Sequence, residues 1–130
     1  MFTVTAQSNN GLVSGPWAGN IELRTAVIWA EVSPSVKSVS VTFHPVNNPK
    51  KTKTIKYKGE LGKDFNPVKI ELNGLDIETQ FTYQLLLNEK SISTPYPLYF
   101  NTKPLWQHRK PATDFSFLAG SCAYFNEPIY

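Results

Sequence analysis

The residue types most suited to chemistry lie together near the end of the chain. Gly120, Ser121 and Cys122 follow an apolar stretch, and Cys122, the only cysteine, is its first reactive side chain. The backbone N–H groups of Gly120 and Ser121 could face an oxyanion or a phosphate group. Ser121 is not expected to be a nucleophile, because it lacks the second flanking glycine of a nucleophile elbow and has no identifiable His or Asp partners.

Cys122 also has a simpler interpretation, as a small buried hydrophobic residue at a strand end. A closed metal site needs about four ligands. His44 and His108 lie far from Cys122 and from each other in the sequence, at no metal-ligand spacing, so both are expected to be solvated. The sequence predicts no catalytic residue and no cofactor for this chain on its own.

One segment is dense in charge, with five lysines: Lys50, Lys51, Lys53, Lys56 and Lys58. It could bind phosphate polymers, anionic glycans or nucleic acid. It could instead be a solvated hairpin whose lysines keep an edge strand from pairing with neighbours. Because no interleaved aromatic residues provide a stacking platform, we predict the protective role and no nucleic-acid partner.

The elements that must position these residues are mostly β-strands. Alternating residues predict strands over 12–20, 21–32, 38–44, 51–58, 68–72, 80–87 and 96–102. No stretch shows sustained helical periodicity. About seven short strands separated by turn signals indicate an all-β fold, an antiparallel fibronectin III/immunoglobulin-like β-sandwich. Val39, Val41 and Phe43, and later Leu98 and Phe100, are predicted to face inward.

The three tryptophans have different surroundings. Alternation groups Trp29 with Thr25, Val27 and Glu31, opposite the face of Ala26 and Ile28. Its place on a central strand nevertheless resembles that of a core tryptophan in such sandwiches.

Trp17 follows Gly15-Pro16, and Trp106 lies in a linker rich in Lys and Pro. We expect both to pack between the sandwich and a following domain. The alternative is that this aromatic pair holds a sugar ring.

Residues 114–124 form an apolar run that reads as a strand buried on both faces. Such strands belong to α/β sheets, whose working residues lie in the loop after the carboxyl end of the strand. The expected organisation is therefore a sandwich over 1–103, an extended polar linker over 104–113, and the first strand and loop of another domain over 114–130. Through its unpaired edge, the segment 114–125 is expected to mediate weak self-association.

Composition sets few further limits. The net charge is +3 and 41% of the residues are hydrophobic, enough for a core. A single cysteine excludes an internal disulfide. Residues 1–5 lack the basic and apolar regions of a signal peptide, and the longest apolar runs are far shorter than a membrane span. No transmembrane segment is predicted.

The segment 75–81 resembles the fibronectin type III pattern in which Leu, then Thr, then an aromatic residue enter the penultimate strand. That family usually has a tyrosine at the aromatic position, and its hydroxyl bonds back to the chain. Here the position is Phe81, so this hydrogen bond is expected to be absent, and Tyr83 points the same way. Residues 100–104 look like the last strand and exit of such a domain.

Three features together resemble the amino-terminal region of PhoD-like phosphatases, the alkaline phosphatase D family of metallophosphoesterases. They are Gly15-Pro16, the segment 22–29, and the Phe-x-Phe-x-x-Gly-Ser-Cys pattern of residues 115–122 after a sandwich. The resemblance implies a fibronectin-like domain that precedes a four-layer α/β catalytic domain. The later Asp, His and Asn motifs that hold metals and orient the attacking water in such enzymes are absent from the sequence.

For a full-length parent, the resemblance implies iron and/or calcium or other divalent metals, with Cys122 as an iron ligand, and export to the periplasm or the extracellular space. The chain would then be a non-catalytic accessory domain whose partner is the missing C-terminal catalytic domain. The alternative is a free-standing fibronectin-like binding module for carbohydrate or protein. The apolar run after the linker favours the first, because a free module would leave it exposed.

Overall fold

Strands with a residue period of two form almost all the regular structure. The computed structural model describes residues 11–107, 111–112 and 114–120. Within these ranges the elements are β1 (Leu12–Gly19), β2 (Thr25–Val32), β3 (Val39–Pro45), the 3-10 helix η1 (Pro49–Lys51), β4 (Lys53–Lys56), β5 (Asn66–Asn73), β6 (Gln80–Leu87), β7 (Lys90–Ser91) and β8 (Tyr99–Asn101).

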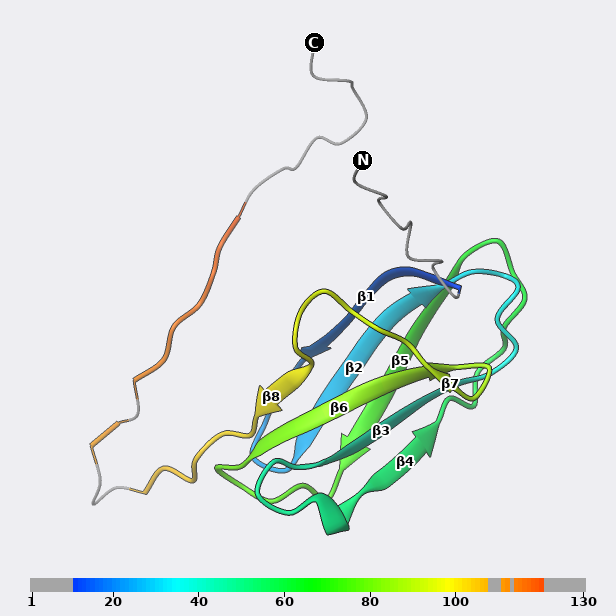
Figure 1. The fold of residues 1–130 in the computed structure, drawn as a ribbon. Coiled ribbons are helices and arrows are strands. Elements are labelled where there is room, and N and C mark those ends of the chain that lie inside the picture. The colour runs from blue at the N-terminus through cyan, green and yellow to red at the C-terminus, as the bar shows by residue number, and fades with distance from the viewer. Residues whose placement is uncertain (1–10, 108–110, 113, 121–130) are drawn as a thin grey trace, which may run out of the picture.

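The strands form two antiparallel sheets that face each other (Figure 1). One sheet has the order β1-β2-β5. The other has the order β4-β3-β6, and both β7 and β8 pair with the remaining edge of β6. This arrangement confirms the predicted all-β, fibronectin III/immunoglobulin-like sandwich.

The core lies between the two sheets, and alternation decides which side chains enter it. Val39, Val41 and Phe43 of β3 are buried as predicted, and buried residues alternate with more exposed ones in the same way along β2, β5 and β6. Phe43, Phe81 and Phe100 form an aromatic group in the core; the rings of Phe81 and Phe100 stack with centroids 5.3 Å apart. Burying each such side chain contributes about 1.5–3 kcal/mol, so this alternation provides the main stabilisation.

Several predicted strands are longer than the observed ones, whereas β5 is longer than the strand predicted over 68–72. The strand expected over 21–32 begins at Thr25, and the one expected over 96–102 covers only Tyr99–Asn101. In the segment expected over 51–58, Lys51 ends the 3-10 helix η1 and only Lys53–Lys56 form the strand β4. The two-residue strand β7 has too short a pattern to be predicted. Leu98, expected to face inward with Phe100, is only partly buried.

The strand β4 lies at one edge of its sheet, and Lys53 and Lys56 are exposed on it. Exposed lysines on a short edge strand hinder pairing with another chain. Of the five lysines for which we predicted a protective role, only Lys53 and Lys56 lie on β4, and the role itself remains a prediction.

The corner that leads into β6 is held by Thr102, because Phe81 has no hydroxyl to do so. The buried Thr102 Oγ1 donates a hydrogen bond to the Asp76 carbonyl (2.7 Å) and accepts one from the Thr79 N–H (3.0 Å). Backbone bonds from Thr102 to Thr79 and from Lys103 to Glu22 tie the same end of the chain to the sandwich. The hydrogen-bonded sandwich thus includes Lys103.

Beyond Lys103, the described residues have no regular secondary structure, and they run away from the two sheets (Figure 1). Residues 114–120, the described part of the strand expected over 114–124, form no strand. Phe115 and Phe117 are 85% and 78% exposed, and Leu118 is fully exposed. In the described ranges, no helix is long and apolar enough to cross a bilayer.

Candidate functional site

The residues first considered for chemistry fall mostly outside the described part of the chain. Ser121, Cys122 and His108 lie outside it, so the proposed metal-ligand role of Cys122 remains a prediction. Gly120 is described and is exposed in a segment without regular structure. Among the residues that the structure places, no three His, Cys, Asp or Glu side chains come together as a metal site.

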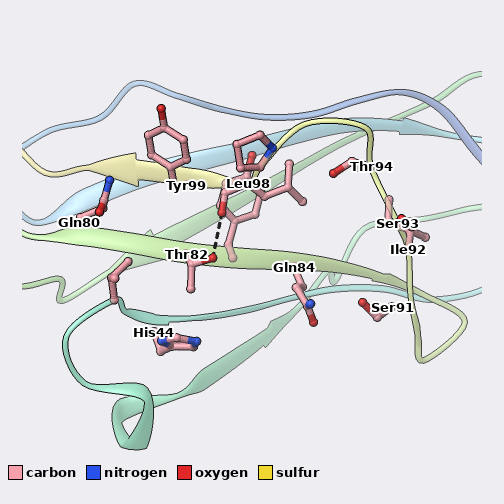
Figure 2. Close-up of a pocket in the computed structure, with 13 residues that line it drawn as sticks. His44, Gln80, Thr82, Gln84, Ser91, Ile92, Ser93, Thr94, Leu98 and Tyr99 are labelled. Carbon is pink, nitrogen blue, oxygen red and sulfur yellow. Dashed lines mark hydrogen bonds between the residues drawn. The ribbon is translucent and has the colours of Figure 1, made fainter.

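A groove lies over the outer face of β6, on the sheet β4-β3-β6, with a volume of about 760 Å³. Between β7 and β8, backbone hydrogen bonds join the chain to β6 at Ile92–Leu85 and again at Leu98–Tyr83, and the groove is lined by Thr82 and Gln84 together with residues of the intervening loop. Figure 2 shows these two side chains on β6 between His44 on β3 and Tyr99 on β8. Thr82 Oγ1 donates a hydrogen bond to the Leu98 carbonyl (3.1 Å), which holds the rim.

The groove has both polar and apolar side chains in its lining, and none of them is Asp, Glu, Lys or Arg. His44, which we expected to be solvated, is half-buried in it, and its Nδ1–H donates to the Pro45 carbonyl (2.9 Å). Burial, with a smaller effect of the nearby Tyr96, raises the pKa of Tyr83 to about 12. The Tyr83 phenol therefore stays protonated at neutral pH. Such a groove can offer hydrogen bonds, but it has no strong base or nucleophile.

A second hollow lies on the opposite side of the sandwich, on the outer face of β1-β2-β5. We call it the tryptophan cleft; its lining is Trp17, Gly19, Asn20, Val27, Trp29, Lys69 and Glu71, and its volume is about 380 Å³. Trp17 and Trp29 are cross-strand neighbours, and their rings stack with centroids 4.5 Å apart and an interplanar angle of 18°.

Irregular pairing between β1 and β2 brings the two tryptophans together. The register shifts between Leu12 and Ser14 and again between Ser14 and Trp17. Continuing the register of the Leu12–Val32 pair would place Gly15 opposite Trp29. Gly15 has φ +83°, and a Cβ there would come within 3.0 Å of the Trp29 carbonyl oxygen. Glycine therefore permits the bulge that moves Trp17 beside Trp29.

The structure corrects the expectation for Trp29, which is not a core residue. It lies half-buried on the outer face with Val27, because the adjacent positions Ile28 and Ala30 already face the core. Trp17 lies in the cleft and is 51% exposed. Trp106 is about half exposed and does not line the cleft, so the structure does not bring Trp17 and Trp106 together as one aromatic pair.

No family model and no curated protein matches the chain. Among solved structures, the sensor domain of the anti-sigma factor RsgI4 from Pseudobacteroides cellulosolvens is similar, with 18% identity over 79% of this chain and 96% of that chain and a TM-score of 0.54. A redesigned β-sandwich protein aligns with 20% identity over 72% of this chain and 95% of that chain (TM-score 0.52). A fibronectin type III domain derived from the human KIAA0970 protein aligns with 16% identity over 85% and 86% (TM-score 0.47).

At these identities, the similarity to the RsgI4 sensor domain and to the redesigned β-sandwich protein shows the β-sandwich fold and not a function, because this architecture carries many unrelated functions. Any functional conclusion has to come from the surfaces of the module. Among the described residues, those surfaces include the groove over β6, the tryptophan cleft and the exposed apolar segment after Lys103.

Proposed function

We propose that this chain is a non-catalytic, fibronectin-like module that functions by binding. The observation that carries the proposal is the tryptophan cleft. Trp17 and Trp29 lie outside the core, and Trp17 is 51% exposed although it belongs to a paired strand. Large aromatic side chains in a concave surface are frequent anchors of binding sites, and core packing does not account for them here.

The proposal is tested with three classes of ligand: neutral soluble polysaccharides, the anionic polysaccharide heparin, and unfolded casein as a polypeptide. Binding is measured by native electrophoresis in gels that each contain one ligand, in which a chain that binds migrates more slowly than in a gel without ligand. We expect at least one class to bind and Trp17→Ala to weaken that binding. Tyr99→Ala, on the opposite sheet, should leave it unchanged. If the wild-type chain binds none of the three, the proposed function is wrong.

As a second candidate, we propose that the module is the accessory domain of a PhoD-like phosphatase. The observation that favours it is the exposure of Phe115, Phe117 and Leu118 beyond a finished sandwich. A following catalytic domain would cover these residues by adding neighbouring strands, which would remove an exposed apolar surface. The activity would then belong to the following domain, with Cys122 as one metal ligand.

The second candidate is tested in the coding sequence after the codon for Tyr130. We expect an open reading frame that encodes clustered Asp, Asn and His motifs. The extended protein should hydrolyse a phosphate ester in a metal-dependent reaction. Cys122→Ser should lower its iron content, whereas His44→Gln, in the groove of the sandwich, should not. A stop codon, or an unchanged iron content in Cys122→Ser, would contradict this assignment.

A further inference from the structure

We propose that the tryptophan cleft binds a neutral carbohydrate, through one or two pyranose rings. This inference rests on the proposed binding function and names its ligand class. It depends on four properties of the cleft: an aromatic wall, a floor without side-chain bulk, a pair of opposite charges, and a size that suits a small ligand.

The wall consists of Trp17 and Trp29. Their rings stack on each other, so each ring covers one face of its neighbour, and half of Trp17 remains exposed to a ligand. The face of an indole ring carries a partial negative charge, which attracts the partially positive hydrogen atoms of polarised C–H groups. One side of a pyranose ring presents such C–H groups together, so a sugar can lie against the wall without placing hydroxyl groups on it.

The floor of the cleft is open at Gly19, which has no side chain and which lies opposite Val27 in the pairing of β1 with β2. A Cβ built on Gly19 meets no atom within 4 Å, so the space above this residue is empty. Val27 supplies a small apolar surface beside it. The cleft is therefore a hollow next to the two tryptophans, in which a flat ring has room.

The far side of the cleft carries the ammonium group of Lys69 and the carboxylate of Glu71, which face outward two residues apart on β5. Both side chains are exposed, and in the described part of the chain neither belongs to a salt bridge. Lysine offers only donors and a carboxylate only acceptors, and Asn20 at the rim offers both. Adjacent sugar hydroxyl groups can accept and donate hydrogen bonds at once, which matches this set.

Charge and size argue for a neutral sugar over the other classes. Lys69 and Glu71 cancel each other, so the cleft has no excess charge that would favour an anionic glycan or a basic peptide. A volume of about 380 Å³ lies in the range of about 300–1,000 Å³ usual for small-molecule sites. The groove over β6 is also neutral, but tryptophan does not line it.

The first experiment titrates the chain with hexasaccharides of glucose, xylose and mannose, using calorimetry and tryptophan fluorescence. We expect saturable binding of at least one of them, with a change in tryptophan emission. Trp17→Ala should weaken it about tenfold or more, as for an aromatic anchor in a binding site. Tyr99→Ala, on the opposite sheet, should keep the wild-type affinity.

The second experiment fills the cleft without removing any contact. Gly19→Val introduces a residue that is favoured in strands at a position with free space and no positive φ, so the fold should be preserved. We expect a loss of affinity of about tenfold with an unchanged melting temperature. The matched control is Gly120→Val, the same substitution in open space outside the sandwich, which should leave the affinity unchanged.

The outcomes separate the inference from the function on which it rests. If casein or heparin binds in a Trp17-dependent way and no hexasaccharide does, the module binds through the cleft but the carbohydrate assignment is wrong. If a hexasaccharide binds equally well to wild type, Trp17→Ala and Gly19→Val, the site lies elsewhere and the inference fails. If nothing binds, both proposals are wrong.

Discussion

The sandwich and the segment that follows it contain the same kinds of apolar residue in opposite surroundings. Phe43 in β3 is 2% exposed, whereas Phe117 in the segment after the linker is 78% exposed. Both phenylalanines lie in short runs that mix apolar residues with polar ones. The difference is that β3 has β4 and β6 as neighbours and a second sheet across the core.

This contrast shows that an apolar pattern specifies which side chains would be buried, and not whether anything is there to bury them. A strand gains stability through cross-strand neighbours and a covering layer. For residues 114–120 the structure shows neither. Such a segment contributes little to the stability of this chain.

The largest expected effect comes from making the same substitution in both regions. Phe43→Ala should lower the free energy of unfolding by about 3–5 kcal/mol, because it opens a cavity in a packed core. Phe117→Ala should change it by less than about 0.5 kcal/mol, since its side chain is largely in solvent. Urea unfolding measures both. Similar losses in the two variants would mean that residues 114–120 pack on the sandwich.

The next effect concerns the point where the sandwich ends. Thr102→Val keeps the shape of a buried side chain but removes the hydroxyl that donates to the Asp76 carbonyl and accepts from the Thr79 N–H. Leaving these backbone groups without a partner should lower the free energy of unfolding by about 2 kcal/mol. Thr94→Val is the control: its hydroxyl bonds to the Tyr96 carbonyl in a loop that water can reach, so its loss should be smaller. Equal losses would show that Thr102 does not hold the corner.

Much of the fold could be predicted from the sequence, because each central strand has one face in the core. In β2, the same alternation also placed Trp29 on the face of Val27 and Glu31, where the structure has it. The expectation of a core tryptophan gave the size of the side chain more weight than its position in the alternation. Applied consistently, the alternation would have predicted an outward-facing Trp29.

The cleft itself could not be predicted, because it depends on the register between two strands. The bulged pairing around Gly15 moves Trp17 beside Trp29, and such shifts leave no clear periodic signal. Lys69 comes from β5, about 40 positions later in the sequence, and joins the site only through pairing with β2. The role of Thr102 was missed for a similar reason, since a threonine next to a last strand has no distinctive pattern.

The sandwich also contains a buried phenol, Tyr83, whose ionisation should make the stability of the fold depend on pH. Tyr83 has its pKa raised to about 12 by burial, against about 10 in the unfolded chain. Below about pH 10 this tyrosine is protonated in both the folded and the unfolded state, and its contribution to the free energy of unfolding is fully present. Between about pH 10 and about pH 12 the unfolded state loses the proton first, so stability should fall as the pH rises. Urea unfolding across this range should show a shallower fall in Tyr83→Phe. Parallel curves for the two proteins would contradict the burial of this phenol.

The smallest expected effect on stability comes from ending the chain at Thr113, which removes the exposed apolar segment. Because the hydrogen-bonded sandwich ends at Lys103, the free energy of unfolding should change by less than about 0.5 kcal/mol.

The same truncation should abolish a weak self-association that we expect residues 114–125 to mediate, since Phe115, Phe117 and Leu118 would otherwise meet those of another copy. Sedimentation at high concentration measures this association. The double substitution of Phe115 and Phe117 by Ser keeps the full length of the chain and removes only these two aromatic side chains, and it should abolish the association equally well. If the shortened chain unfolds, the domain boundary is wrong and the two regions are one structure. If it stays folded but still self-associates, the contact between copies lies on the sandwich, where the tryptophan cleft is the first surface to examine.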